Sequence, residues 1–102
     1  MSVLHLDKHN FGEAVLSEKP ILIDFYADWC GPCRMLAPII EDVAAEREDL
    51  SVAKINVDAE PELAAHFGVV SIPTLILLQD GKEVRRASGS RPKAGVLKLI
   101  DG

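Results

Sequence analysis

Two cysteines, Cys30 and Cys33, stand three positions apart in the segment Trp29-Cys30-Gly31-Pro32-Cys33, and the 102-residue chain has no others. The apolar run 21–26 precedes them and a helix-like segment follows. A disulfide that closes so short a loop removes little entropy from the unfolded chain, so structural stapling is a weak reason for this spacing. The spacing favours thiol–disulfide chemistry.

The place of Cys30 at the start of a helix predicts a reactive thiolate. The first helical turn has unpaired N–H groups and the positive end of the helix dipole, and both stabilise a nearby anion. We therefore expect a lowered pKa for the Cys30 thiol, because thiolate is the species that attacks disulfides. Cys33, one turn further along, would reach the Cys30 sulfur and resolve a mixed disulfide while shielded from solvent.

The residues alone leave two other interpretations of the pair open. Cys-x-x-Cys is half of a zinc site, but the chain has no second cysteine pair and its histidines show no ligand spacing. We therefore expect no metal. The two cysteines could also be inert and buried, although their place between a central strand and a helix argues against this.

Asp24, in the apolar run before the cysteines, is the second residue that could do chemistry. One interpretation places it at the exposed end of a strand. The other makes it a buried acid, because burial is costly for a carboxylate and raises its pKa. Such an acid would exchange a proton with Cys33. The residues alone do not decide between the two.

Apolar runs predict the strands that must position these residues, at 3–6, 21–26, 52–57, 74–78 and about 82–87. Asp80-Gly81 between the last two strands indicates a hairpin.

Helical patterns fill the intervals between the strands. They are predicted after Asp7, which can cap the first helix, from about 33 to 47 with a kink at Pro38, from 61 to just before Gly68, and from 92 onward. The order βαβαβαββα predicts an α/β fold, a five-stranded mixed sheet with helices on both faces. We expect one domain over residues 1–102.

The composition narrows the partners and the compartment. A net charge of −5, spread along the chain, argues against a nucleic-acid or anionic-membrane surface, which needs clustered Lys and Arg. No segment approaches the ~20 apolar residues that span a bilayer. The first residues lack the basic and apolar regions of a signal peptide. We therefore expect a cytoplasmic protein, and nothing in the sequence demands more than a monomer.

Further motifs accompany the cysteine pair in a definite order. They are Asp24-Phe25, Pro38, Lys54-Ile55-Asn56-Val57-Asp58, Ser71-Ile72-Pro73-Thr74, Asp80-Gly81 and Gly89. Together with Trp29-Cys30-Gly31-Pro32-Cys33 they resemble the thioredoxin family over nearly the whole chain. The resemblance implies the thioredoxin fold and a protein-disulfide reductase, with Cys30 as the nucleophile and Cys33 as the resolving thiol.

The resemblance also implies roles for residues around the pair. It favours Asp24 as the buried proton acceptor and donor, with Lys54 lying near it and tuning it. It implies a cis peptide bond before Pro73, which would face the disulfide and keep metal away from the sulfurs. Ile72 would offer backbone hydrogen bonds to an extended substrate.

Two further sets of residues concern redox tuning and substrate contact. Gly31-Pro32 is the pair typical of reducing thioredoxins, whereas stronger oxidants and isomerases usually have a histidine between the cysteines. Trp29 adjoins the reactive turn and is expected to contact protein substrates. Val70, Ile72 and Gly89, with Gly31, would form an apolar, small-residue floor of the surrounding groove. Such a surface suits varied protein partners.

The resemblance implies that no cofactor binds the chain. Electrons would come indirectly from NADPH through a flavin-dependent thioredoxin reductase, and diverse disulfide-containing proteins would be the substrates. Two other functions remain open. One is a disulfide oxidase or isomerase, and the other is a binding module in which the fold serves as a partner subunit and redox chemistry is incidental.

Overall fold

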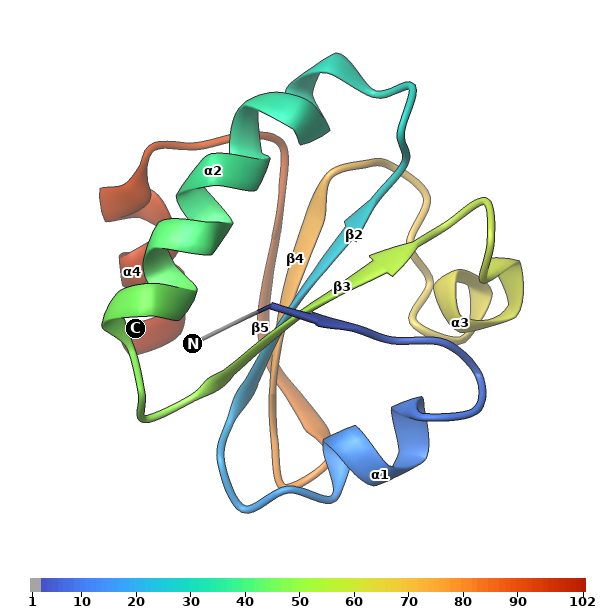
Figure 1. The fold of residues 1–102 in the computed structure, drawn as a ribbon, viewed down its shortest axis with the longest axis horizontal. Coiled ribbons are helices and arrows are strands. Elements are labelled where there is room, and N and C mark those ends of the chain that lie inside the picture. Colours follow the sequence, from blue (N-terminus) through green and yellow to red (C-terminus); the bar gives the residue numbers. More distant parts are fainter. Residues whose placement is uncertain (1–2) are drawn as a thin grey trace.

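The computed structural model describes residues 3–102, and its five strands form one sheet in the order β1-β3-β2-β4-β5. β1, β3 and β2 run parallel, whereas β4 is antiparallel to both β2 and β5. The predicted mixed sheet is confirmed, and β2 lies at its centre (Figure 1). The strands are β1 (Leu4–His5), β2 (Ile21–Tyr26), β3 (Ser51–Asn56), β4 (Thr74–Gln79) and β5 (Lys82–Ser88).

Four helices cover the two faces of the sheet, as predicted. Figure 1 shows α2 (Gly31–Glu46) and α4 (Lys93–Asp101) on one face and α1 (Phe11–Val15) and α3 (Pro61–His66) on the other. Because both faces are covered, β2 can be apolar along almost its whole length. Within residues 3–102, no helix has the length and apolarity that crossing a bilayer requires.

Side chains of β2 alternate between two hydrophobic cores. Leu22 packs in the core beneath α2 and α4, whereas Ile23 packs in the core on the side of α1 and α3. Successive side chains of a strand point to opposite faces, so Asp24 returns to the face that α2 covers. The sheet thus places the Asp24 carboxyl on the face covered by α2, the helix that begins at the cysteines.

Helix α2 begins two residues earlier than predicted, at Gly31 and not at Cys33. Pro32 fits the first turn because the N–H that it lacks would have no partner inside the helix there. Cys30 is consequently the N-cap residue. The helix continues across Pro38 to Glu46.

Helix α1 is shorter than predicted, because Asp7 stabilises a turn instead of capping the helix. Its Oδ1 atom accepts hydrogen bonds from the backbone N–H groups of His9 and Asn10 at 2.8 and 3.0 Å. A short polar side chain that bonds its own backbone competes with the helix in this way. Asn10 is therefore the N-cap residue, and α1 begins at Phe11.

The hairpin predicted at Asp80-Gly81 is confirmed. Asp80 has φ 54° and Gly81 has φ 76°, which are the positive values that a two-residue hairpin turn requires. β4 and β5 pair antiparallel from Thr74 opposite Ser88 to Gln79 opposite Lys82. This pairing fixes the position of the loop before β4, which approaches the cysteines.

Candidate redox site at the N-terminus of α2

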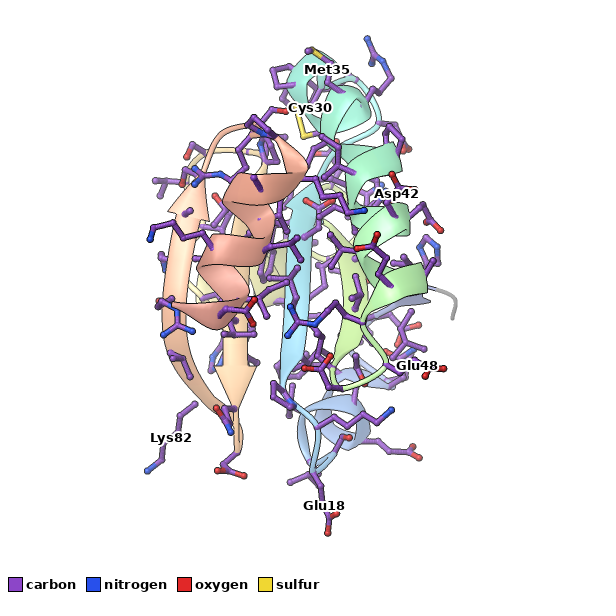
Figure 2. The ribbon with its side chains drawn as sticks, turned by 90° about the vertical axis from the view of Figure 1, so that its left-hand side faces the viewer. Glu18, Cys30, Met35, Asp42, Glu48 and Lys82 are labelled. Atoms are coloured by element: carbon purple, nitrogen blue, oxygen red, sulfur yellow. A yellow bond between two sulfur atoms is a disulfide. The ribbon has the colours of Figure 1, made fainter. Side chains whose placement is uncertain are left out.

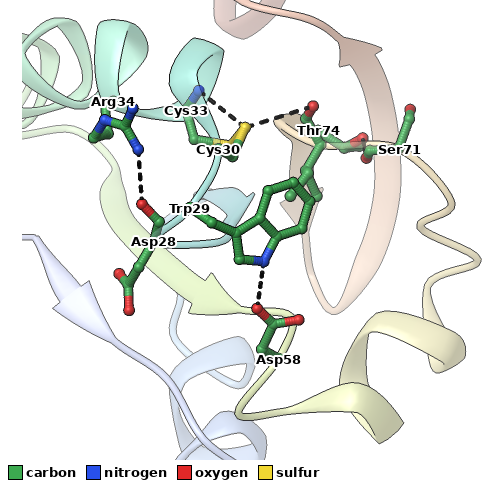
Figure 3. The surroundings of a disulfide bond; sticks show 9 residues. Asp28, Trp29, Cys30, Cys33, Arg34, Asp58, Ser71 and Thr74 are labelled. Carbon is green, nitrogen blue, oxygen red and sulfur yellow. Dashed lines mark hydrogen bonds between the residues drawn. A yellow bond between two sulfur atoms is a disulfide. The ribbon is translucent and has the colours of Figure 1, made fainter.

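Cys30 and Cys33 are joined by a disulfide at the start of α2, with their Cα atoms 5.2 Å apart. The backbone N–H of Cys33 donates a hydrogen bond to the Cys30 sulfur at 3.2 Å (Figure 3). Figure 2 shows Cys30 at one end of the molecule, with Glu18 and Lys82 at the opposite end. The Cys30 sulfur therefore meets the unpaired N–H groups of the helix, as its place in the sequence predicts.

Both cysteines are buried, with 4 % of Cys30 and 3 % of Cys33 exposed. They pack with Ala27 and with partly buried Tyr26 and Ile72. The expected shielding of Cys33 is confirmed, but Cys30 is almost equally shielded. Exposure therefore does not distinguish the two sulfurs, whereas the helix N–H directed at Cys30 does. Among residues 3–102, no group of three or more His, Cys, Asp or Glu side chains is placed to hold a metal ion.

The loop before β4 lies beside the disulfide. The Cys30 sulfur is 4.0 Å from the carbonyl oxygen of Ile72, and the peptide bond between Ile72 and Pro73 is cis, as the resemblance implies. The Thr74 hydroxyl donates a hydrogen bond to the carbonyl oxygen of Ser71 at 2.6 Å. These contacts hold the Ile72 carbonyl next to the reactive sulfur.

Trp29 is 68 % exposed, and its indole N–H donates a hydrogen bond to Asp58 Oδ2 at 2.7 Å (Figure 3). The motifs in the sequence did not predict this bond. A usable signal exists, because Trp29 follows β2 and Asp58 follows β3, and parallel neighbouring strands end at the same edge of a sheet. The bond fixes the indole next to the disulfide.

Val70 does not form the floor of a groove, contrary to the expectation. It is 98 % exposed, because it lies in the loop between α3 and β4 and no element covers it. Gly89 is also exposed, with φ 92°, and its N–H donates to the carbonyl oxygen of Pro73 at 2.8 Å. Val70 thus projects from the surface, while Gly89 bonds to the loop that carries Pro73.

Asp24 is buried, with 1 % of its surface exposed, so the exposed-end interpretation is wrong. Within residues 3–102, neither of its carboxyl oxygens has a hydrogen-bond partner. Burial raises the pKa of Asp24 from 3.8 to about 6, and the nearby charge of Lys54 partly opposes this shift. Lys54 is opposite Asp24 in the register of β2 and β3. The two residues are therefore neighbours across the two strands.

A small cavity connects Lys54 with the redox pair. Its volume is about 160 Å³, and Tyr26, Lys54 and Cys33 line it together with Asp28 and Arg34. The Lys54 ammonium lies 4.3 Å from the centroid of the Tyr26 ring. The site therefore combines a disulfide at a helix N-terminus, a buried carboxyl without a partner, and an ammonium in a cavity lined by Cys33.

Comparisons with known proteins agree with this geometry. The family model described as Thioredoxin matches residues 2–102. The chain is 54% identical over 89 residues to a thioredoxin of Mycobacterium bovis, covering 86% of this chain and 77% of that one. It is 50% identical over 93 residues to a bifunctional thioredoxin reductase/thioredoxin of Mycobacterium leprae, covering 90% of this chain and 20% of that one.

A solved structure supports the same assignment. A mutant thioredoxin from Halobacterium salinarum superposes with a TM-score of 0.92 at 38% identity, covering 98% of this chain and 88% of that one. Three observations support one family assignment: the sheet order, the cysteine disulfide at the start of α2 and the family match over residues 2–102. The chain belongs to the thioredoxin family.

Proposed function

We propose that this chain reduces disulfide bonds of other proteins by dithiol–disulfide exchange through Cys30 and Cys33. The observation that carries the proposal is the disulfide at the N-terminus of α2, with the Cys33 N–H directed at the Cys30 sulfur. In the reduced protein, the same N–H and the helix dipole stabilise a Cys30 thiolate and lower the pKa of its thiol. Cys30 is therefore the attacking sulfur.

The exchange has two steps. The Cys30 thiolate attacks one sulfur of the target disulfide, and the other target sulfur leaves as a thiolate and takes up a proton. Cys33 then loses its proton and attacks the Cys30 sulfur, which breaks the mixed disulfide and releases the second target sulfur as a thiolate that takes up a proton. The target gains two electrons from the chain and two protons, one equivalent to the proton that Cys33 gives up and one from solvent, and the chain is left with the Cys30–Cys33 disulfide.

Asp24 accepts the Cys33 proton in the second step. A carboxyl with a pKa of about 6 is largely ionised near neutral pH, yet it binds a proton far better than an exposed carboxylate does. The absence of hydrogen-bond partners for its oxygens within the described residues leaves them free to take that proton. Lys54 tunes the acid, because its positive charge favours the ionised form.

Residues around the disulfide bind the substrate and set the redox poise. Exposed Trp29 and Val70 offer apolar contacts to a protein partner. The Ile72 carbonyl oxygen, next to the Cys30 sulfur, accepts a hydrogen bond from the backbone of that partner. Pro73 and Gly89 complete this surface. Gly31-Pro32 between the cysteines keeps the pair reducing, which distinguishes the chain from disulfide oxidases and isomerases.

The electron donor is a thioredoxin reductase that uses NADPH and a flavin, and this chain binds no cofactor of its own. The name of the Mycobacterium leprae relative joins a thioredoxin reductase and a thioredoxin in one protein, which supports this pairing. The substrates are diverse disulfide-containing proteins. The chain acts as a monomer in the cytoplasm.

NADPH oxidation in the presence of a thioredoxin reductase and a disulfide-bonded test protein tests the proposal. We expect turnover that depends on both the chain and the test protein. Cys30→Ser and Cys33→Ser should abolish it, whereas Ser17→Ala, far from the site, should not. Dithiothreitol in place of the reductase should give the same order of activities. Undiminished reduction by Cys30→Ser would refute the proposal.

The redox poise separates a reductase from an oxidase or isomerase. The fraction of disulfide is measured after equilibration in glutathione buffers of defined ratio. We expect the Cys30–Cys33 pair to remain oxidised in buffers that reduce protein disulfide isomerases. A pair that glutathione reduces readily would favour the oxidase or isomerase function.

A further inference from the structure

Tyr26, Asp24 and Lys54 share one patch of the sheet. Asp24 and Tyr26 are two positions apart on β2, and Lys54 lies opposite Asp24 on β3. Because strand side chains alternate, all three project from the face that α2 covers. The Lys54 ammonium lies 4.3 Å from the centroid of the Tyr26 ring.

The ammonium contacts the ring although an unpartnered carboxyl lies nearby. Asp24 is opposite Lys54 in the register, and its oxygens have no hydrogen-bond partner among residues 3–102. A lysine stem is long and flexible, so its ammonium has a choice between the carboxylate and the ring. A partly desolvated ring face attracts an ammonium, and this attraction biases the choice toward the ring.

The charge that acts on the Asp24 carboxyl is that of Lys54. On the opposite strand, β4, the register partner of Asp24 is the apolar Leu75. The cavity also contains Asp28 and Arg34, and Arg34 donates a hydrogen bond to the carbonyl oxygen of Asp28 at 3.0 Å. From α2, Cys33 lines the same cavity. The position of the Lys54 ammonium is therefore the main electrostatic control on Asp24.

We propose that Tyr26 is a positioning residue whose ring holds the Lys54 ammonium in the cavity beside Cys33 and off the Asp24 carboxyl. A direct ion pair with Lys54 would favour the ionised carboxyl strongly and make Asp24 a poor acceptor for the Cys33 proton. The contribution of this contact to disulfide exchange rests on the proposed function. Its effect on the ionisation of Asp24 does not.

Carbon NMR of the Asp24 carboxyl tests the proposal in the oxidised protein, as a function of pH. Tyr26→Leu releases the ammonium, and we expect the pKa of Asp24 to fall by about half a unit. Tyr26→Phe keeps the ring face and should leave the pKa unchanged. A rise, or no change, in Tyr26→Leu would overturn the proposal.

The Lys54→Met background separates positioning from packing. Without an ammonium to release, Tyr26→Leu should not change the pKa of Asp24. An equal fall in that background would show that the ring acts through packing alone and would overturn the proposal. If Tyr26→Leu does not fold, Tyr26→Trp replaces it. The larger ring binds the ammonium at least as well, so a fall in the Asp24 pKa would contradict the proposal.

The titration needs no turnover, so its outcome is independent of the reductase assay. A chain that fails to reduce disulfides would refute the proposed function and leave the Tyr26 measurement valid. In an active chain, we expect the pH profile of disulfide exchange in Tyr26→Leu to shift to lower pH by the same amount as the Asp24 pKa. A profile that stays in place while the pKa falls would refute the contribution of Tyr26 to exchange.

Discussion

Replacement of Asp24 by alanine should stabilise the fold progressively as the pH rises. The carboxyl is 1 % exposed, and its oxygens lack hydrogen-bond partners within residues 3–102. Ionisation of such a group is costly in the folded protein and cheap in the unfolded one. The folded protein therefore holds the proton more tightly, and its pKa is about 6 against 3.8 without burial.

The sign and size of the effect follow from these two pKa values. Stability associated with protonated Asp24 is fully present below about pH 3.8 and is lost as the pH rises through about 6. A difference of about 2 units corresponds to a loss of about 3 kcal/mol, most of which falls between pH 4 and pH 8. The alanine variant escapes this loss, so its stability relative to the unmodified protein should rise by about 2–3 kcal/mol over that range.

Urea unfolding of the oxidised proteins at several pH values measures this difference. The disulfide removes thiol titration from the comparison. The cavity left by alanine changes the absolute stability, but that contribution does not depend on pH. The slope of the stability difference with pH is therefore the quantity to compare, and not its value at one pH.

Asp24→Asn is the matched control, because it keeps the size of the side chain but cannot ionise. The free energies of unfolding of Asp24→Asn and Asp24→Ala should differ by a constant amount and depend on pH in the same way. A stability difference that stays flat from pH 4 to pH 8 would refute the argument that the carboxyl is buried without compensation. So would variants that lose stability relative to the unmodified protein as the pH rises.

Three further outcomes follow from the structure. Cys33→Ser should trap target proteins as mixed disulfides on Cys30, seen on non-reducing gels, and an absence of adducts under these conditions would contradict the assigned order of attack. Trp29→Phe removes the indole donor and should raise KM for protein disulfides while changing stability by about 1 kcal/mol or less. A fall in kcat with unchanged KM would contradict this expectation. Leu36→Ala, in the core beneath α2, should cost about 2–5 kcal/mol in urea unfolding, whereas its exposed neighbour Met35→Ala should cost about 0.5 kcal/mol or less. Equal losses in the two variants would contradict the packing described here.

The sequence of elements along the chain was sufficient to predict the position of the redox pair. An apolar strand, a short turn and a helix that can begin near Pro32 place Cys30 at a helix N-terminus in any fold that keeps those elements. The hairpin at Asp80-Gly81 follows from the same kind of signal, because the two residues accept positive φ. Helix ends were less predictable, since the Asp7 side chain stabilises a turn and does not cap the first helix.

Tertiary structure alone decided the surroundings of the pair. Asp24 is buried because α2 and the neighbouring strands cover its face of the sheet, and no local pattern separates that outcome from an exposed strand end. Trp29 meets Asp58, and Lys54 meets Tyr26, because β2 and β3 pair in one particular parallel register. A register is a property of two strands together, so residues far apart in the sequence acquire their partners, and their proton affinities, only when the sheet forms.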